Sequence, residues 1–232
     1  MPLLRKLSLN NNRLSSDACP SLAEALKKAI NMEEIDLSYN KIDDAGVKEI
    51  AEALPEMKNL KQINLSSNNI GSAGGKAFAE ALAASKNLEG LRLSGNSLGN
   101  ETLGKLAPVL PSLHHLKVLH LSSCGIDYEG VTHLSKYLFS CPQIEEISLS
   151  ENSIGCKGAM ILIERLPQCS QLKKIELKVC NISDGAFKML AFCVIRCPLI
   201  EEIILSWNKL GDESAADLAK VLPKMARLRI LE

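Results

Sequence analysis

A leucine, isoleucine or methionine returns every 28 residues along this chain of 232 residues, without one insertion or deletion. Such a regular repeat constrains the fold more than any single motif, because each unit has to bury its apolar face against a copy of itself. The residues that set the register are Leu4, Met32, Leu60, Leu88, Leu116, Ile144, Leu172, Ile200 and Leu228. The repeat predicts a solenoid whose successive coils stack side by side.

Other positions of each coil also carry the same type of residue from copy to copy, and each such set of equivalent residues is called a column. A second apolar residue lies three positions later, and a leucine lies two positions after that in every complete copy. The next column is Asn12, Asn40, Asn68, Asn96, Cys124, Asn152, Cys180 and Asn208. Alternating apolar positions predict a short strand with one buried face. A buried amide at the turn after it satisfies backbone groups that the turn leaves unpaired, and cysteine fits the same space.

The second half of each coil changes to helical spacing. In the second coil, Val47, Ile50, Ala51 and Leu54 fall on one face of a helix. Asp, Ser or Gly precedes most of the equivalent stretches, as expected of N-caps. Each unit is therefore predicted to be strand, turn, helix and loop. Parallel strands would line the concave side of a horseshoe and helices its convex side, because a helix is wider than the roughly 4.8 Å between strands.

The consensus LxxLxLxx(N/C)x(L/I) is the leucine-rich repeat signature, and its details resemble the ribonuclease-inhibitor-like subfamily. These details are the long strand-and-helix unit, the Asn/Cys mixture, and a glycine followed by apolar residues four and eight positions later, as from Gly46 to Leu54. Segments such as LKQINLSSNNIGSAGGKAFAEAL are most similar to the repeat regions of NOD-like receptors. The resemblance implies an α/β, right-handed leucine-rich-repeat solenoid that serves as a non-enzymatic recognition module.

Within that family, the resemblance favours the sensor and autoinhibitory region of a cytoplasmic innate immune receptor. Two alternatives stay open. One is an enzyme inhibitor like ribonuclease inhibitor, which is richer in cysteine, strongly acidic, and alternates two repeat lengths. The other is a Ran GTPase-activating type of regulator, which would act on its GTPase in trans.

We expect residues 1–232 to form one leucine-rich repeat domain of eight full repeats and the start of a ninth. The first repeat begins almost at Met1, and the ninth stops at Glu232 in mid-strand. Solenoids usually close with atypical capping repeats that cover the terminal cores. Since neither end shows one, we expect the chain to be a fragment of a longer protein.

The charge balance restricts the class of partner. The 27 Lys and Arg residues equal the 27 Asp and Glu residues, so the formal net charge is zero. A nucleic-acid-binding protein usually has a basic excess, and no apolar run approaches the roughly 18 residues of a membrane span. We expect a protein or peptide ligand, or other domains of the same receptor, with no nucleic acid and no membrane. Composition does not fix the oligomeric state.

The residues that carry catalytic or metal chemistry in other proteins fall on structural columns here. Five of the eight cysteines belong to two repeat columns, and there is no CxxC motif, so we expect reduced thiols. His120 is expected on the concave side, Cys124 in the core and His133 on a helix, so they diverge rather than form a metal site. The glycine-rich segment 71–77 lacks the spacing of a phosphate-binding loop. We therefore predict no enzyme activity, no metal and no cofactor.

One column next to the first leucine alternates in charge at every coil: Arg5, Glu33, Lys61, Glu89, Lys117, Glu145, Lys173, Glu201 and Arg229. In stacked parallel strands these side chains are lateral neighbours. Each interior charge is predicted to lie between two opposite charges, each contact contributing roughly 0.2–1 kcal/mol. The column is interpreted as self-complementary stacking rather than a ligand-binding stripe, and it suggests a unit of two repeats.

Ligand contacts are expected instead at concave positions on either side of the third leucine. Most of these are small or polar, but an apolar group containing the single tryptophan occurs in the seventh and eighth coils. The predicted protein-binding residues are Trp207, Ile204, Val179, Lys178 and Glu176, followed by Tyr39 with Asp36 and by Arg92 with His120. Apolar residues around a tryptophan are typical of interface hot spots. The alternative is that later repeats cover this group.

Overall fold

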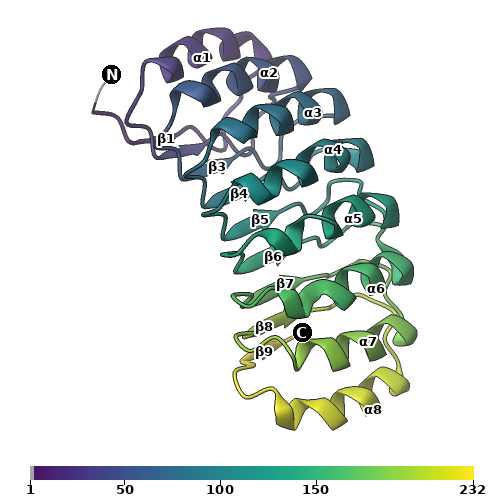
Figure 1. Cartoon of the computed structure of the whole chain (residues 1–232). Coiled ribbons are helices and arrows are strands. Elements are labelled where there is room, and N and C mark those ends of the chain that lie inside the picture. Colours follow the sequence, from purple (N-terminus) through teal and green to yellow (C-terminus); the bar gives the residue numbers. More distant parts are fainter. Residues whose placement is uncertain (1–2) are drawn as a thin grey trace.

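The computed structural model describes residues 3–232, including every side chain in that range except that of residue 139. Nine parallel strands form one sheet in chain order (Figure 1). The strands are β1 Lys6–Ser8, β2 Glu34–Asp36, β3 Gln62–Asn64, β4 Gly90–Arg92, β5 Val118–His120, β6 Glu146–Ser148, β7 Lys174–Glu176, β8 Glu202–Ile204 and β9 Ile230–Leu231. Each pairs with the next at a shift of 28 residues, as Leu7 with Ile35. The predicted repeat therefore sets the register of the sheet.

Helices cover the convex side of the curved solenoid, and the sheet lines the concave side (Figure 1). The α-helices are α1 Cys19–Lys27, α2 Asp44–Ala53, α3 Ser72–Ala81, α4 Gly99–Leu106, α5 Tyr128–Ser135, α6 Gly155–Arg165, α7 Asp184–Val194 and α8 Asp212–Val221. Short 3₁₀ turns adjoin most of them: η1 Ser16–Ala18, η2 Leu54–Glu56, η3 Leu82–Ala84, η4 Ala107–Ser112, η5 Leu138–Ser140, η6 Leu166–Gln168 and η7 Leu222–Lys224. This arrangement confirms the predicted α/β leucine-rich-repeat solenoid.

The core is the layer between the sheet and the helices. Apolar columns of strand and helix meet there, and residues such as Ile35, Leu65, Ile50 and Leu82 are fully buried. Burying a side chain of this size contributes roughly 1.5–3 kcal/mol. Because the same contacts recur in every coil, each coil depends on its neighbours for stability.

The asparagine column performs the predicted task at its buried turns, as Asn40 shows. The Nδ2 amide of Asn40 donates to Leu9 O at 2.9 Å and to Leu37 O at 3.0 Å, while its Oδ1 accepts from Leu14 N at 3.0 Å. The buried amide thus joins its own turn to the preceding coil. In coil five, Cys124 takes this place and its Sγ lies 3.4 Å from Leu93 O.

The turns between strand and helix come in two forms. In coils four and six, Gly99 and Gly155 have positive φ angles of 67° and 64°. Their N–H groups donate to the carbonyl oxygens of Cys124 and Cys180 in the next coil, both at 2.9 Å. Elsewhere, isolated β-bridges join neighbouring coils: Ser15 with Lys41, Gly71 with Ser97, Asp127 with Ser153, and Ser183 with Lys209. The two forms alternate from coil three to coil seven, as in a unit of two repeats, whereas coils two and eight have Asp43 and an extended Gly211 at the glycine position.

The two turn forms change how the helices begin. Asp43 caps α2, because its Oδ1 accepts from Ala45 N at 2.9 Å and Gly46 N at 3.2 Å. The expected Asp, Ser or Gly N-cap also precedes α3, α5, α7 and α8. It is absent from α4 and α6, which start at the left-handed glycines themselves. Within α3, a Cβ on Gly74 would lie 2.7 Å from the Asp44 Cα, so this glycine-rich segment serves helix packing.

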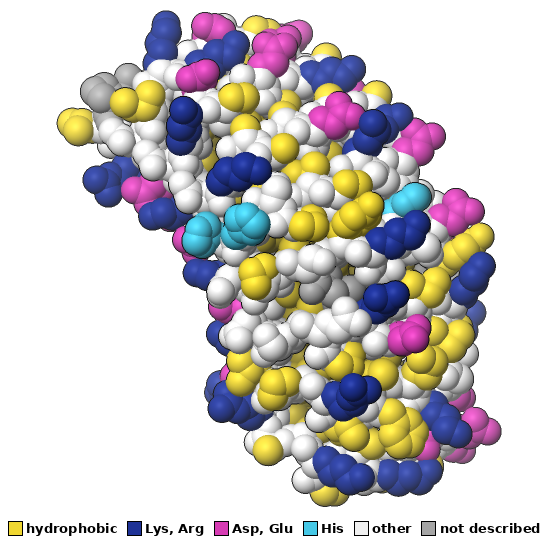
Figure 2. Space-filling model, viewed as in Figure 1, with side chains coloured by type: hydrophobic (Ala, Val, Ile, Leu, Met, Phe, Trp, Pro, Cys, Tyr) yellow, Lys and Arg dark blue, Asp and Glu magenta, His cyan; other side chains and the backbone are white. Residues whose placement is uncertain are grey.

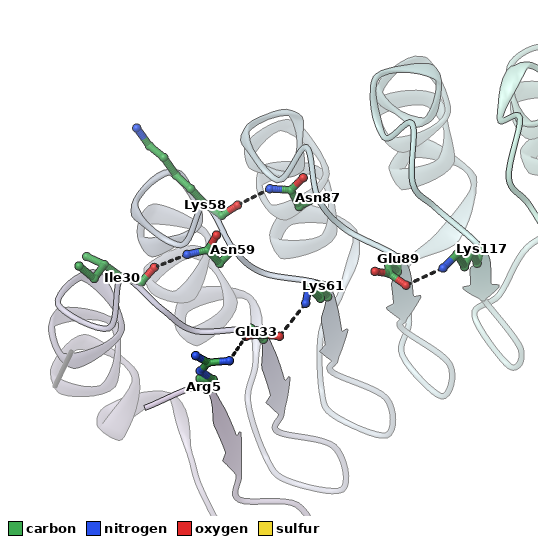
Figure 3. Close-up of polar contacts among 9 residues, drawn as sticks. All are labelled: Arg5, Ile30, Glu33, Lys58, Asn59, Lys61, Asn87, Glu89 and Lys117. Atoms are coloured by element: carbon green, nitrogen blue, oxygen red, sulfur yellow. Dashed lines mark hydrogen bonds and ion pairs between the residues drawn. The ribbon is translucent and has the colours of Figure 1, made fainter. Parts of the chain in front are cut away.

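The alternating charge column lies along the edge of the sheet, but its contacts are less uniform than predicted. Glu33 contacts both neighbours, Arg5 at 3.3 Å and Lys61 at 2.7 Å (Figure 3). Further along, each glutamate pairs with the cation of the following coil: Glu89 with Lys117, Glu145 with Lys173, and Glu201 with Arg229. Each interior charge therefore lies between two opposite charges, as predicted, but a flexible lysine side chain turns toward one carboxylate and forms an ion pair with that one.

Side-chain amides add a second set of links between coils on the helix-to-strand loops (Figure 3). Asn59 Nδ2 donates to Ile30 O at 3.1 Å, and Asn87 Nδ2 donates to Lys58 O at 2.8 Å. On the face seen in Figure 2, lysine and arginine side chains are scattered among apolar and acidic ones.

Candidate functional site

A charged network occupies the concave face of the C-terminal coils. Lys174 on β7 lies at its centre, with its Nζ 2.8 Å from Glu176, 3.4 Å from Glu202 and 3.5 Å from Glu146. These carboxylates come from three adjacent strands, β6, β7 and β8. One ammonium group thus serves three carboxylates, so the network has excess negative charge.

Polar contacts favour the ionised forms of two carboxyl groups of the network, Glu146 and Glu176. His120 Nε2 on β5 lies 3.1 Å from Glu146 Oε1, and this contact is the largest influence lowering the pKa of Glu146. Burial raises the pKa of Glu176, but the bonds from Lys174 and Ser148 outweigh it, and the net direction is downward. The pKa of Lys174 is raised, chiefly by its hydrogen bond to Glu176. Glu146, Glu176 and Lys174 therefore favour their charged forms.

Serine hydroxyls extend the network along the sheet. Ser148 Oγ donates to Glu176 Oε2 at 2.5 Å, and Ser122 Oγ lies 2.6 Å from Ser148 Oγ. A shallow hollow of about 230 Å³ beside the network is lined by Val118, Glu145, Glu146, Lys173, Lys174, Glu201 and Glu202. The predicted site included Glu176 and His120 but missed Glu146, Lys174 and Glu202. These three residues hold the first position of consecutive strands, and the sheet places them side by side. A comparison of that position across coils would therefore have indicated them.

The turn directly after each strand has a left-handed backbone at one column. Its members are Asn11, Tyr39, Ser67, Gly95, Ser123, Glu151, Val179 and Trp207, with φ between 51° and 70°. Glycine and asparagine adopt this conformation easily, whereas a β-branched residue there is strained. Val179 is such a residue. Backbone strain of this kind concentrates at functional sites.

The apolar members of this column are exposed to solvent. Trp207 is 81% exposed, Tyr39 62% and Val179 43%. Glu151 N donates to Lys178 O at 2.7 Å, and Val179 N donates to Ser206 O at 3.0 Å, so these turns stack laterally. Glu151, Asn152, Ser153, Val179, Asn181 and Trp207 line a hollow of about 430 Å³. An aromatic ring, an aliphatic side chain and a carboxylate thus meet at one rim of the sheet.

The structure brings the five main predicted residues together, though not all on the strands. Glu176 ends β7 and Ile204 ends β8, where the sheet pairs them directly. Lys178, Val179 and Trp207 lie in the turns that follow these strands. Glu176 and Ile204 therefore lie on the strands of the concave sheet, and the other three form the adjoining rim.

The remaining predicted residues lie elsewhere on the concave face. Tyr39 and Asp36 belong to the second coil, where Asp36 Oδ1 accepts from Ser38 N at 3.0 Å. Arg92 on β4 pairs in register with His120, and its Nη1 donates to Gln62 Oε1 at 2.8 Å. A hollow of about 540 Å³ near β1–β4 is lined by Lys6, Leu7, Ser8, Glu34, Ile35, Asp36, Gln62, Asn64 and Arg92. Its two basic and two acidic residues leave it balanced in charge.

The other groups with potential chemistry are dispersed. Within residues 3–232, no three or more His, Cys, Asp or Glu side chains are placed to hold a metal ion. All eight cysteines are free, and burial raises the pKa of the Cys124 thiol to about 12. As expected, His120 faces the concave side, Cys124 is buried and His133 lies on α5. No helix in the described part of the chain is long and apolar enough to cross a membrane.

Family models match most of the chain. A model described as the MHP1/HER1/GIP3 LRR domain matches residues 3–152, and one described as Leucine Rich repeat matches residues 196–219. Among solved structures, internalin C2 from Listeria monocytogenes matches with a TM-score of 0.64 and 19% sequence identity, over 97% of this chain and 79% of that chain. This likeness shows the fold alone.

Two curated relatives match a shorter stretch. Protein NLRC5 of Homo sapiens is 52% identical over 50 residues, which cover 22% of this chain and 3% of that protein. Protein NLRC5 of Mus musculus is 48% identical over 50 residues, with the same coverage. The match spans a very small part of these relatives, and it supports a likeness to the repeat regions of NOD-like receptors.

Proposed function

Because the chain belongs to the leucine-rich repeat family, we propose that it is a recognition module that binds a protein partner through its C-terminal coils. The binding surface comprises the ends of β7 and β8 and the turns that follow them. One observation carries this proposal: Trp207 is the most exposed large apolar side chain of these coils, and it lies beside the strained Val179. Exposed aromatic residues of this kind are the usual anchors of protein interfaces.

We further propose that the module is the sensor and autoinhibitory region of a NOD-like innate immune receptor. The partial similarity to Protein NLRC5 supports this assignment. A cytoplasmic setting is part of the proposal, since eight free cysteines suit a reducing compartment. The partner is then a protein ligand or another domain of the same receptor. No enzyme activity is proposed.

The transcript that encodes the chain tests the receptor assignment. An upstream nucleotide-binding domain in the same reading frame is the expected result. A reading frame that encodes only leucine-rich repeats would contradict it. A ribonuclease inhibition assay and a GTPase turnover assay then test the two alternatives, and we expect no effect in either.

Affinity capture followed by quantitative mass spectrometry tests the binding surface. We expect the double variant Trp207→Ala/Ile204→Ala to lose partners that the unaltered chain retains. Phe192→Ala is the matched control, because it removes an exposed aromatic ring from the helix α7 of the same coils and not from the concave side. Circular dichroism of all three proteins should show equal helix content. Equal capture by the double variant and the control would overturn the proposed surface.

A further inference from the structure

The hollow at the rim of the C-terminal coils combines groups that favour a cation. Trp207 presents an exposed ring, and Glu151 presents a carboxylate two coils earlier in the same turn column. One oxygen of Glu151 accepts from Ser123 Oγ at 2.6 Å, which orients the carboxylate. A ring face and a carboxylate are the two groups that a guanidinium binds best, by stacking on one and hydrogen bonding to the other.

The charge of Glu151 is not neutralised by its neighbours. No ion pair within the described residues involves Glu151. Lys157, the nearest cation along the chain, lies over the Tyr128 ring instead, with its Nζ 3.9 Å from the ring centroid. Val179 supplies an apolar side between ring and carboxylate, suited to the methylene stem of a long basic side chain. The hollow therefore has the chemistry of an arginine side-chain site.

The excess negative charge on the sheet favours a second basic side chain further along the strands. The network around Lys174 has three carboxylates for one ammonium group, and it lies at the start of the same strands that lead to Val179 and Trp207. Lys174 and Val179 are five residues apart, and β7 ends at Glu176 between them, so at most roughly 17 Å of chain separates them. A partner segment in extended conformation covers this span with five or six residues.

We propose that the surface binds an arginine-bearing, extended segment of a partner protein. One arginine enters the hollow between Glu151 and Trp207, and a second cation, five or six residues away, meets the carboxylates around Lys174. This inference rests on the proposed protein-binding function and adds the chemistry of the bound segment. Charge complementarity identifies the occupant, since an acidic segment would meet uncompensated carboxylates at both positions.

The single tryptophan of the chain makes the test direct. The probe is a blocked Gly/Ser peptide with two arginines five residues apart, titrated into the 232-residue chain while tryptophan emission is recorded. Citrulline has nearly the shape of arginine without its charge, so a peptide with two citrullines is the control ligand. We expect the arginine peptide to shift the emission and to bind about tenfold more tightly than the citrulline peptide.

Variants separate the arginine site from the wider function. Glu151→Gln should weaken the arginine peptide about tenfold and leave the citrulline peptide unchanged. Phe192→Ala, on the helix α7, should bind both peptides as the unaltered chain does. Anisotropy of a labelled peptide serves for Trp207→Ala, which lacks the intrinsic signal and should also bind weakly.

Equal affinities for the arginine and citrulline peptides would overturn the proposal, as would unchanged binding by Glu151→Gln or no binding at all. If partner capture still depends on Trp207 in that case, the protein-binding function stands and only the arginine site fails. If capture is also independent of Trp207, both proposals fail.

Discussion

Lys174 Nζ lies 2.8 Å from Glu176 Oε1 on the same strand of the concave sheet, within reach of carboxylates on both neighbouring strands. Replacing it by methionine keeps the length of the side chain but leaves three carboxylates without their shared cation. We expect Lys174→Met to lower the free energy of unfolding by about 1 kcal/mol, after solvent screening is taken into account. Urea unfolding at low and high salt measures this. Salt should reduce the loss, and a loss independent of salt would contradict the electrostatic explanation.

The lowered pKa values of Glu146 and Glu176 predict the direction of a pH effect. A carboxyl group whose pKa is lower in the folded state stabilises the fold above its unfolded pKa, and this stabilisation disappears as pH falls through the folded value. The free energy of unfolding should therefore drop as pH falls below the ordinary glutamate value of 4.5. In Glu146→Gln/Glu176→Gln this drop should be smaller. Unfolding curves from neutral to acid pH test this, and parallel curves for the two proteins would contradict it.

The asparagine column offers a graded test of turn stability. Asn68 donates to Leu37 O and Leu65 O, each at 3.0 Å, and accepts from Ile42 N at 3.0 Å. Asn68→Ala leaves these buried groups unpaired and should lower the free energy of unfolding by about 2–4 kcal/mol. Asn68→Cys is the matched control, because cysteine already occupies this column at two other turns. Its loss should be smaller, and chemical unfolding of both variants will show whether the order holds.

Val179 is expected to reduce the stability of its own turn. Its φ of 52° is strained for a β-branched side chain, whereas Asn11 has φ of 53° at the same turn position in the first coil. We expect Val179→Asn to raise the free energy of unfolding by about 0.5–1 kcal/mol. The same change should weaken partner binding, because it removes an apolar wall of the hollow. Thermal unfolding and the peptide titration measure the two effects. A loss of stability would show that burial of Val179 outweighs its strain.

The sequence predicts the fold of this chain well because its decisive interactions repeat. Columns such as Leu9 and Asn12 recur at fixed spacing, and that spacing is the strand register itself. The sequence predicts that charges alternate in the column of Glu33. It does not predict which of two neighbours each long side chain contacts, because both are within reach. The site was predicted less completely for a similar reason. Trp207 is easily noticed because it is the single tryptophan of the sequence. The contacts of Lys174 involve carboxylates from three strands, which no short stretch of sequence shows.

The left-handed glycines at coils four and six determine which residues these two turns accept. At Gly99 and Gly155, one hydrogen bond to a cysteine carbonyl replaces the bridge between adjacent coils. A Cβ at either position would meet no atom of another coil within 4 Å, so the backbone conformation, and not lack of space, calls for glycine there. Most other residues would therefore strain the link between two coils without clashing with anything.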